Sequence, residues 1–209
     1  MLTPSAAACR RGKGGRYRRE LGQGGWTGSG FGAGSYGARV PQPEVSVRPV
    51  TAAELPVLDR LWLMFRHDMS EFHGGLPRPD GTFRTEHLRA AVEDPGWVAY
   101  LAWTQDRPIG FALVRALDQP VRVLNAFFIV RGLRRTGIAS QVVRDVLSKH
   151  PGFWEVAFQA ANQTAVRFWR RTATDIAGQH WTEEPRAVPT KPDAPPDLWI
   201  SFSTTATAW

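Results

Sequence analysis

The 209-residue chain contains a single cysteine, Cys9. One cysteine near the N-terminus excludes an intrachain disulfide, a zinc site built from several cysteines and a thiol nucleophile in the rest of the chain. The sequence also lacks any apolar run that approaches the length needed to cross a bilayer. We therefore expect a cytoplasmic protein that has no membrane partner.

Acidic residues are nearly missing from the first 40 positions, where seven Lys and Arg stand against Glu20 alone. This segment therefore carries +6 of the net charge of +7, and it also holds eleven of the twenty glycines. A segment of this composition cannot bury a core, so we expect residues 1–44 to form a disordered basic extension. The remainder is nearly neutral, which gives no reason to expect a specific nucleic-acid partner. For the extension, weak non-specific RNA binding, a merely solvated tail and a start codon set too far upstream all stay open.

The most informative stretch runs from Phe127 to Ala139. An apolar, strand-like run enters a turn with three arginines and two glycines, and the turn opens a helix with an apolar stripe. A helix N-terminus has unpaired backbone N–H groups and the positive end of the helix dipole, so it attracts anions. Gly137 allows close approach of a ligand because it has no Cβ. We expect this turn to bind a pyrophosphate.

The order Arg134-x-x-Gly137-x-Ala139 resembles the acyl-CoA-binding motif of the GNAT superfamily of N-acetyltransferases. Asn162 to Arg171 is similar to the Asn-x-x-Ala-x-x-Phe-Tyr segment of that superfamily, and Asp106 to Ala112 is similar to its hairpin into the third strand. The resemblance implies an α/β fold with a mixed, mostly antiparallel sheet flanked by helices. It implies one domain over residues 45–203, followed by a tail over residues 204–209.

The resemblance further implies an acetyl-CoA-dependent N-acetyltransferase whose second partner is a primary amine of a small molecule or, less readily, of a protein. Backbone N–H groups around Phe128 to Val130 would polarise the thioester carbonyl. The segment that begins at Asn162 would border the pantetheine arm. The implied acetyl-CoA contacts are Phe128, Ile129, Val130, Arg134, Arg135, Thr136, Gly137, Ile138, Ala139, Asn162, Ala165, Phe168 and Trp169.

Both proton-transfer positions depart from the superfamily pattern. Many relatives carry a carboxylate as base on the fourth strand, where this chain has Leu124, Asn125 and Ala126. Many also carry a tyrosine as acid where this chain has Trp169, whose indole N–H is only a donor. We therefore expect Trp169 to pack against the CoA arm. The alternative to an enzyme is a GNAT-like domain that binds acyl-CoA without catalysis.

The acceptor side should come from the first two helices and the loop between them, a region with His67, Asp68, Glu71 and His73. Carboxylates suit a cationic amine, and Glu71 is the leading candidate for the base that deprotonates it. Glu155 on the fifth strand is the second candidate. Asp68 and Glu71 can equally be solvated residues of a polar helix face. His67 and Glu71 could share a metal ion, but without a third ligand at a fitting spacing we expect none.

The hydrophobic pattern predicts alternating strands and helices, with a capping box at residues 51–54. Most of the tryptophans fall on apolar faces and are expected in the core. The predicted strands are 45–50, 97–103, 109–115, 121–130, 153–158, 180–188 and 198–203, and the predicted helices are 55–72, 85–92, 137–149 and 162–171.

Overall fold

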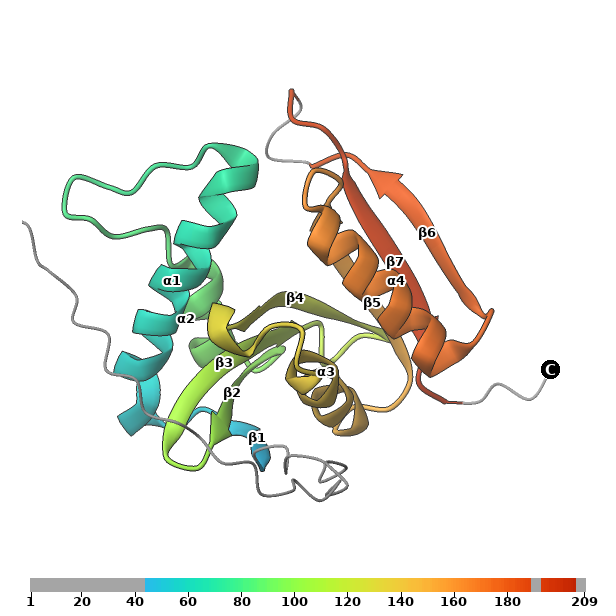
Figure 1. Cartoon of the computed structure of the whole chain (residues 1–209), viewed down its shortest axis with the longest axis horizontal. Coiled ribbons are helices and arrows are strands. Elements are labelled where there is room, and N and C mark those ends of the chain that lie inside the picture. Colours follow the sequence, from blue (N-terminus) through green and yellow to red (C-terminus); the bar gives the residue numbers. More distant parts are fainter. Residues whose placement is uncertain (1–43, 189–192, 206–209) are drawn as a thin grey trace, which may run out of the picture. The chain divides into compact units, whose positions relative to one another are not determined.

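A seven-stranded sheet in the order β1-β2-β3-β4-β5-β7-β6 forms the framework of the chain (Figure 1). The computed structural model describes residues 44–188 and 193–205, all of them within one compact unit, Pro41–Trp209. The predictions made for residues 1–43 therefore lie outside the described residues. The strands are β1 (Val45–Pro49), β2 (Trp97–Thr104), β3 (Arg107–Arg115), β4 (Val121–Ile129), β5 (Phe153–Gln159), β6 (Trp181–Arg186) and β7 (Asp197–Ser203).

Within the described residues, four α-helices cover the sheet: α1 (Leu55–His73), α2 (Glu86–Glu93), α3 (Ile138–Ser148) and α4 (Gln163–Ala177). The predicted capping box is present, and the backbone N–H of Thr51 donates to the carboxylate of Glu54 over 3.0 Å. It caps a short 3-10 turn that leads directly into α1. The helix ends at Gly74, whose φ of 60° is the left-handed conformation that glycine adopts without strain.

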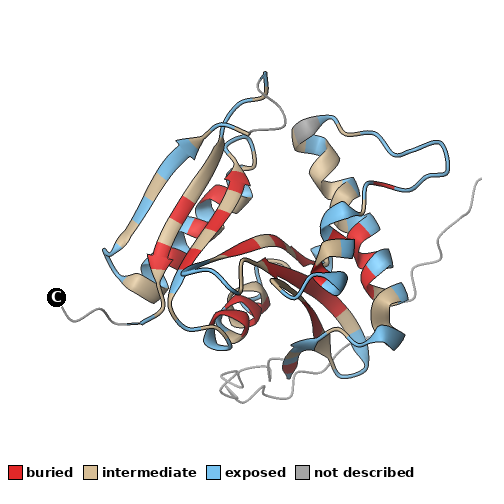
Figure 2. Cartoon of the chain, turned by 180° about the vertical axis from the view of Figure 1, so that it is seen from behind, coloured by how far each residue is buried: buried red, intermediate tan, exposed pale blue. Residues whose placement is uncertain are grey.

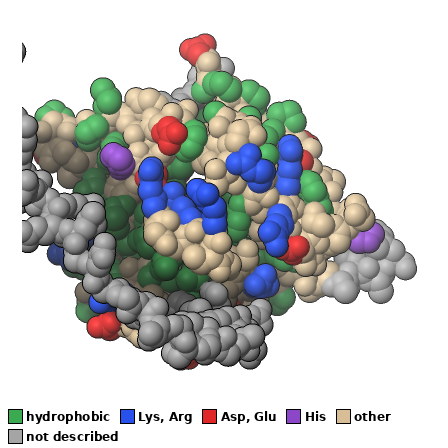
Figure 3. All heavy atoms as spheres, in the orientation of Figure 1, with side chains coloured by type: hydrophobic (Ala, Val, Ile, Leu, Met, Phe, Trp, Pro, Cys, Tyr) green, Lys and Arg blue, Asp and Glu red, His purple; other side chains and the backbone are tan. Residues whose placement is uncertain are grey.

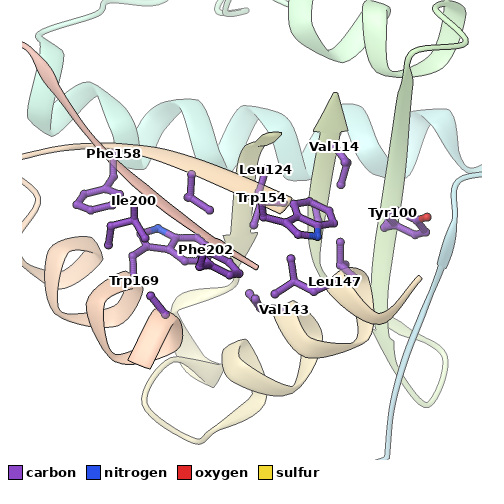
Figure 4. Close-up of a cluster of buried hydrophobic side chains, with 14 of the residues drawn as sticks. Tyr100, Val114, Leu124, Val143, Leu147, Trp154, Phe158, Trp169, Ile200 and Phe202 are labelled. Carbon is purple, nitrogen blue, oxygen red and sulfur yellow. The ribbon is translucent and has the colours of Figure 1, made fainter. Parts of the chain in front are cut away.

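The two helix pairs lie on opposite faces of the sheet. Leu58, Leu61 and Trp62 of α1 pack with buried residues of α2 and of strands β2 to β4. The apolar sides of α3 and α4 pack on the other face, around the fully buried Trp154 (Figure 4). Figure 2 shows the buried residues concentrated on the central strands and the inner sides of the helices, whereas β6 is exposed or half-buried.

The strand pair β4–β5 is the one parallel pair among the described strands, and it is short. Its register runs only from Val121 opposite Phe153 to Leu124 opposite Val156. One residue later, β4 has a bulge against β3, because Leu113 pairs with Ala126 while Val114 pairs with Leu124. The second half of β4 therefore has no described strand as a partner on its β5 side. We call this stretch of β4, from Asn125 to Ile129, where no described strand pairs with its β5 side, the β4–β5 gap.

The sequence-based assignment of strands and helices is confirmed over the described residues. The largest difference is at α4, which was expected to end near Arg171 and continues to Ala177. The extension is amphipathic, since Thr172 and Ala173 are buried against the sheet. No helix in the described part of the chain is long and apolar enough to cross a bilayer.

Close contact between β3 and β4 depends on Gly110. A Cβ at this position would overlap the carbonyl oxygen of Phe128 and would lie 2.7 Å from Cδ1 of Ile129. Gly110→Ala should therefore push the strands apart and lower the free energy of unfolding by about 2–3 kcal/mol. Urea denaturation measures this loss. Gly132→Ala is the matched control, because nothing lies within 4 Å of its Cβ, and equal stability of the two variants would contradict the prediction.

Candidate functional site

The turn from β4 into α3 adopts an unusual backbone conformation. Gly137 has a φ of 92° and Arg135 has a φ of 66°, so two residues of this short turn are left-handed. Glycine tolerates such a φ, whereas arginine adopts it at a cost of order 1–3 kcal/mol. The hydroxyl of Thr136 donates to the carbonyl of Leu133 over 2.7 Å and helps to fix the turn.

This conformation leaves a row of free backbone donors. Gln141 is the first residue after the turn whose backbone N–H makes a helical hydrogen bond, which it donates to the carbonyl of Gly137. Within residues 44–188 and 193–205, the N–H groups of residues 136–140 have no hydrogen-bond acceptor. They begin an eleven-residue helix, and Figure 3 shows Lys and Arg side chains gathered on the face that carries this turn. The arrangement can hold a doubly charged anion such as a pyrophosphate.

Two arginines of the turn are held by a carboxylate of α1. Asp68 accepts hydrogen bonds from Arg131, at 2.7 Å and 3.0 Å, and from Nη2 of Arg134. Nε of Arg134 also donates to the carbonyl of Ile129 over 2.8 Å. Both contacts of Arg134, the arginine of the motif, are therefore within the protein, and they position the turn. Arg135 is exposed and makes no ion pair among the described residues. The sequence alone did not indicate this link between α1 and the turn.

The Asp68 link should make stability depend on pH. Burial of Asp68 favours its protonated form, but the hydrogen bonds from Arg131 and Arg134 outweigh this effect and lower the pKa of the carboxyl. A lowered folded-state pKa stabilises the protein above the unfolded value of about 3.9, and the contribution is lost as the pH falls through the folded value. Asp68→Asn should therefore cost about 1 kcal/mol at pH 7 and progressively less towards pH 3.

Urea denaturation of both proteins across this pH range tests the Asp68 prediction. Asp59→Asn provides the control, because Asp59 is exposed on the same helix and has no ion-pair partner among the described residues. A difference between Asp68→Asn and the wild-type chain that stays constant from pH 7 to pH 3 would show that the ion pair does not stabilise the fold.

Backbone groups of β4 point into the β4–β5 gap at every second residue. The N–H of Val130 donates to the carbonyl of Ile109 over 2.9 Å, so it faces β3 and is not available to a ligand. Antiparallel strands alternate, so the N–H groups of Ile129 and Phe127 face the other way. Of the range predicted to polarise a thioester, Ile129 is therefore the residue whose N–H points into the gap.

Aromatic side chains pack between the unpaired half of β4 and α4, beside the gap. Phe127 stacks on Phe168 with ring centroids 5.9 Å apart, and it meets Trp169 edge-to-face at 5.7 Å. Trp169 is buried and belongs to the same core as Trp154. The side chain of Asn162 accepts a hydrogen bond from the N–H of Ala165 over 3.0 Å and caps α4. The predicted contacts of both motifs therefore lie at the two sides of the gap.

The other face of the sheet has two hollows that border β4. The first, the α1 groove, has a volume of about 470 Å³ and is mainly apolar. It is lined by Leu63, Met64, His67, Asp68, Phe128, Val130 and Arg131. Glu71, the predicted base, is exposed one turn beyond Asp68 on α1 and does not line this groove.

The second hollow, the bulge cavity, has a volume of about 400 Å³ and reaches the point where β4 and β5 separate. It is lined by His87, Trp97, Arg115, Asn125, Ala187, Val188, Asp197 and Trp199. These residues come from separate segments of the chain, and sequence reasoning did not single out His87, Arg115 or Asp197. Asn125 was noted only as the replacement for a carboxylate.

Glu155, the second base candidate, lies on β5 between β4 and β7 rather than at a sheet edge. Arg186 donates to both of its carboxylate oxygens, over 2.8 Å and 3.0 Å, and Ser201 adds a third hydrogen bond. The hydrogen bonds from Arg186 lower the pKa of Glu155, although burial opposes them. A carboxylate held in this way is a weak proton acceptor. The described residues contain no group of three or more His, Cys, Asp or Glu side chains that could hold a metal ion.

Comparison with known proteins agrees with the fold. The model of the acetyltransferase (GNAT) family matches residues 61–173. An acetyltransferase from Thermus thermophilus superposes with a TM-score of 0.57 at 15% identity, over 76% of this chain and 96% of its own. Spermidine N-acetyltransferase from Vibrio cholerae, solved with CoA and spermine, superposes with a TM-score of 0.56 at 11% identity, over 77% of this chain and 95% of its own. At these identities the structures establish a shared fold. A search of curated protein sequences found no match.

Proposed function

Since this chain belongs to the GNAT acetyltransferase family, we propose that it transfers an acetyl group from acetyl-CoA to a primary amine of a small molecule. The observation that carries the proposal is the row of free N–H groups at residues 136–140 beside the β4–β5 gap. This row suits the pyrophosphate of CoA. The gap then leads from the pyrophosphate site along the unpaired edge of β4.

In the proposed reaction, the amine nitrogen attacks the thioester carbon and the C–S bond breaks as CoA leaves as a thiolate. A backbone N–H that β4 presents to the gap, that of Ile129 or that of Phe127 nearer the bulge, would stabilise the negative charge that develops on the carbonyl oxygen. Holding both reactants in line supplies much of the acceleration. Trp169 cannot protonate the thiolate because its indole does not titrate usefully, so the proton comes from solvent or from the attacking nitrogen, which must lose a proton to become the amide.

Glu71 remains the proposed base. It is exposed on α1, and its neighbour Asp68 lines the α1 groove. Glu71→Gln should lower kcat/KM most at low pH, where removal of the ammonium proton limits the rate. The matched control is Glu93→Gln, an exposed glutamate at the end of α2. If Glu71→Gln equals wild type from pH 6 to pH 9, the base is another group or water.

Two observations favour a second candidate, a GNAT domain that binds acyl-CoA without catalysis. The bulge of β4 carries Asn125 in place of a carboxylate, and Trp169 stands where relatives carry a tyrosine. A binding domain would still need the free N–H groups of the turn, so those groups do not separate the two candidates. We also propose a cytoplasmic location and no requirement for a metal.

An assay of CoA release tests the proposal directly. The full chain is incubated with acetyl-CoA and a panel of polyamines, aminoglycosides, amino acids and basic peptides, and free thiol is titrated with a chromogenic disulfide. Repeated turnover with at least one amine supports the enzyme. Acetyl-CoA binding by calorimetry, with no amine turned over, would support the silent domain instead. Absence of acetyl-CoA binding would overturn both.

A further inference from the structure

We propose that the bulge cavity binds the carboxylate of an acceptor that carries both a carboxylate and the primary amine, as an α-amino acid does. The inference rests on the proposed function, because it names the class of amine that the acetyl group would reach. Its basis is the set of polar groups around Arg115, Asn125 and His87, which come from β3, β4 and α2.

Arg115 is the only arginine or lysine among the described residues that line the cavity. Its Nε donates to Oδ1 of Asn125 over 3.2 Å, and in the described part of the chain its remaining guanidinium N–H groups have no hydrogen-bond partner and no ion-pair partner. The side chain is half-buried. A guanidinium with two free donors on one edge fits a carboxylate through a pair of parallel hydrogen bonds.

The hydrogen bond from Arg115 also determines what His87 can do. Because Oδ1 of Asn125 accepts from Arg115, Nδ2 of Asn125 faces Nδ1 of His87, at 3.1 Å, and donates to it. Nδ1 is then the acceptor, so the neutral ring carries its proton on Nε2. Burial lowers the pKa of His87, with help from Arg115 and Arg66, and this favours the neutral ring. His87 lines the cavity, and its Nε2–H has no hydrogen-bond acceptor among the described residues, so we infer that it can act as a second donor to a bound oxygen.

No acidic group among the described residues accepts a hydrogen bond from Arg115, although the charge of Glu155 is near enough to act on it. Arg186 donates two hydrogen bonds to Glu155 and one to Glu184, so both carboxylates already have a partner.

Asp197 has one carboxylate oxygen without a partner among the described residues. Its Oδ1 accepts a hydrogen bond from Gln159 over 3.2 Å, and its Oδ2 accepts none among the described residues. The cavity therefore offers donors to a carboxylate from Arg115 and His87, and it offers one free carboxylate oxygen of Asp197 to an ammonium group.

The cavity can also accommodate the rest of such a molecule. Trp97 and Trp199 are among the residues that line it, which favours an apolar or aromatic side chain on the acceptor. A carboxylate bound to Arg115 would place a neighbouring amine at the bulge of β4, where the β4–β5 gap begins. A polyamine, which has no carboxylate, would leave the donors of Arg115 unused and would be repelled by its charge.

Pairs of amines that differ only in the carboxylate test the inference. Phenylalanine, tryptophan, histidine and lysine are compared with phenethylamine, tryptamine, histamine and cadaverine in the CoA-release assay. We expect at least one amino acid to exceed its decarboxylated partner in kcat/KM by about tenfold to a hundredfold, the worth of a charge-assisted hydrogen bond. In Arg115→Gln this preference should disappear through a higher KM for the amino acid alone, and Arg115→Lys should recover part of it.

Arg107→Gln serves as the control, since Arg107 is exposed at the other end of β3. Wild-type preference for the decarboxylated amines, or an equal rise in KM for both members of a pair in Arg115→Gln, would overturn the inference while leaving the acetyltransferase intact. If no amine is acetylated, calorimetric titration with the amino acids and their N-acetyl derivatives decides the matter. Binding that is lost in Arg115→Gln but kept in Arg107→Gln supports the carboxylate site even if the domain is not catalytic. If none of these compounds binds to the wild-type chain, the proposed carboxylate site is wrong.

Discussion

Replacing Gly137 with valine is expected to abolish acetyl-CoA binding. The φ of Gly137 is 92°, a value that β-branched residues almost never adopt, and the residue lies among the free N–H groups of the turn. Because nothing lies within 4 Å of its Cβ position, a side chain there would occupy the space of the ligand rather than that of the protein. Such a side chain would prevent several charge-assisted hydrogen bonds of about 1.5–3 kcal/mol each, so we expect the Kd for acetyl-CoA to rise by about a hundredfold or more.

Calorimetric titration of acetyl-CoA into the wild-type chain and the variant measures this effect. Gly178→Val is the matched control, because Gly178 also has a positive φ and an empty Cβ position but lies at the end of α4. The control should lose stability through backbone strain and keep its affinity. Unchanged affinity for acetyl-CoA in Gly137→Val would show that the pyrophosphate does not bind at this turn.

The second large effect is expected at Trp169, where packing and ligand binding meet. The side chain is buried and contacts both Phe127 and Phe168, so Trp169→Ala should lower the free energy of unfolding by about 3–5 kcal/mol. Below its melting temperature, this variant should also show a raised KM for acetyl-CoA, because the aromatic wall of the β4–β5 gap is removed. Trp169→Phe keeps an aromatic ring at that wall and should retain most of the turnover.

Trp154→Phe is the control for Trp169, since Trp154 is fully buried in the same core but sits where β4 and β5 are still paired. It should lose stability without any change in the KM for acetyl-CoA. An unchanged KM in Trp169→Ala would show that Trp169 only packs the core. Trp169→Tyr adds a titratable donor near the sulfur, and such a group can raise turnover by about 10²-fold in favourable cases.

Much of the fold could be predicted from the sequence because each element carries its own periodicity. The helix that begins after Gly137 and the strand from Phe153 were both recognisable from local pattern alone. The boundary of α4 was misjudged because Thr172, although polar, is buried in the last turns of that helix. A buried threonine looks the same in a sequence as an exposed one.

The sequence predicted the parts of the candidate site whose residues are close together in the chain. It did not predict the parts formed by residues far apart in the chain. The turn around Arg134 and Gly137 is contiguous in the chain, so its motif is visible. The commitment of Arg134 to Asp68 joins residues 66 positions apart, and the contact between Asn125 and His87 spans 38. No pattern within either segment indicates its partner, because the pairing is created only when α1 and α2 pack on the sheet.

The short seam between β4 and β5 has a thermodynamic consequence. Only four paired positions connect the two halves of the described sheet, strands β1, β2, β3 and β4 on one side and strands β5, β7 and β6 on the other. Beyond Leu124, the backbone amides of β4 that face β5 have no partner among the described strands and can therefore exchange their protons with solvent. A molecule that hydrogen-bonds to Ile129 and also touches α4 would act as a clamp across the seam. Deuterium uptake at Phe127 and Ile129 should therefore slow when acetyl-CoA is added, and the melting temperature should rise with its concentration.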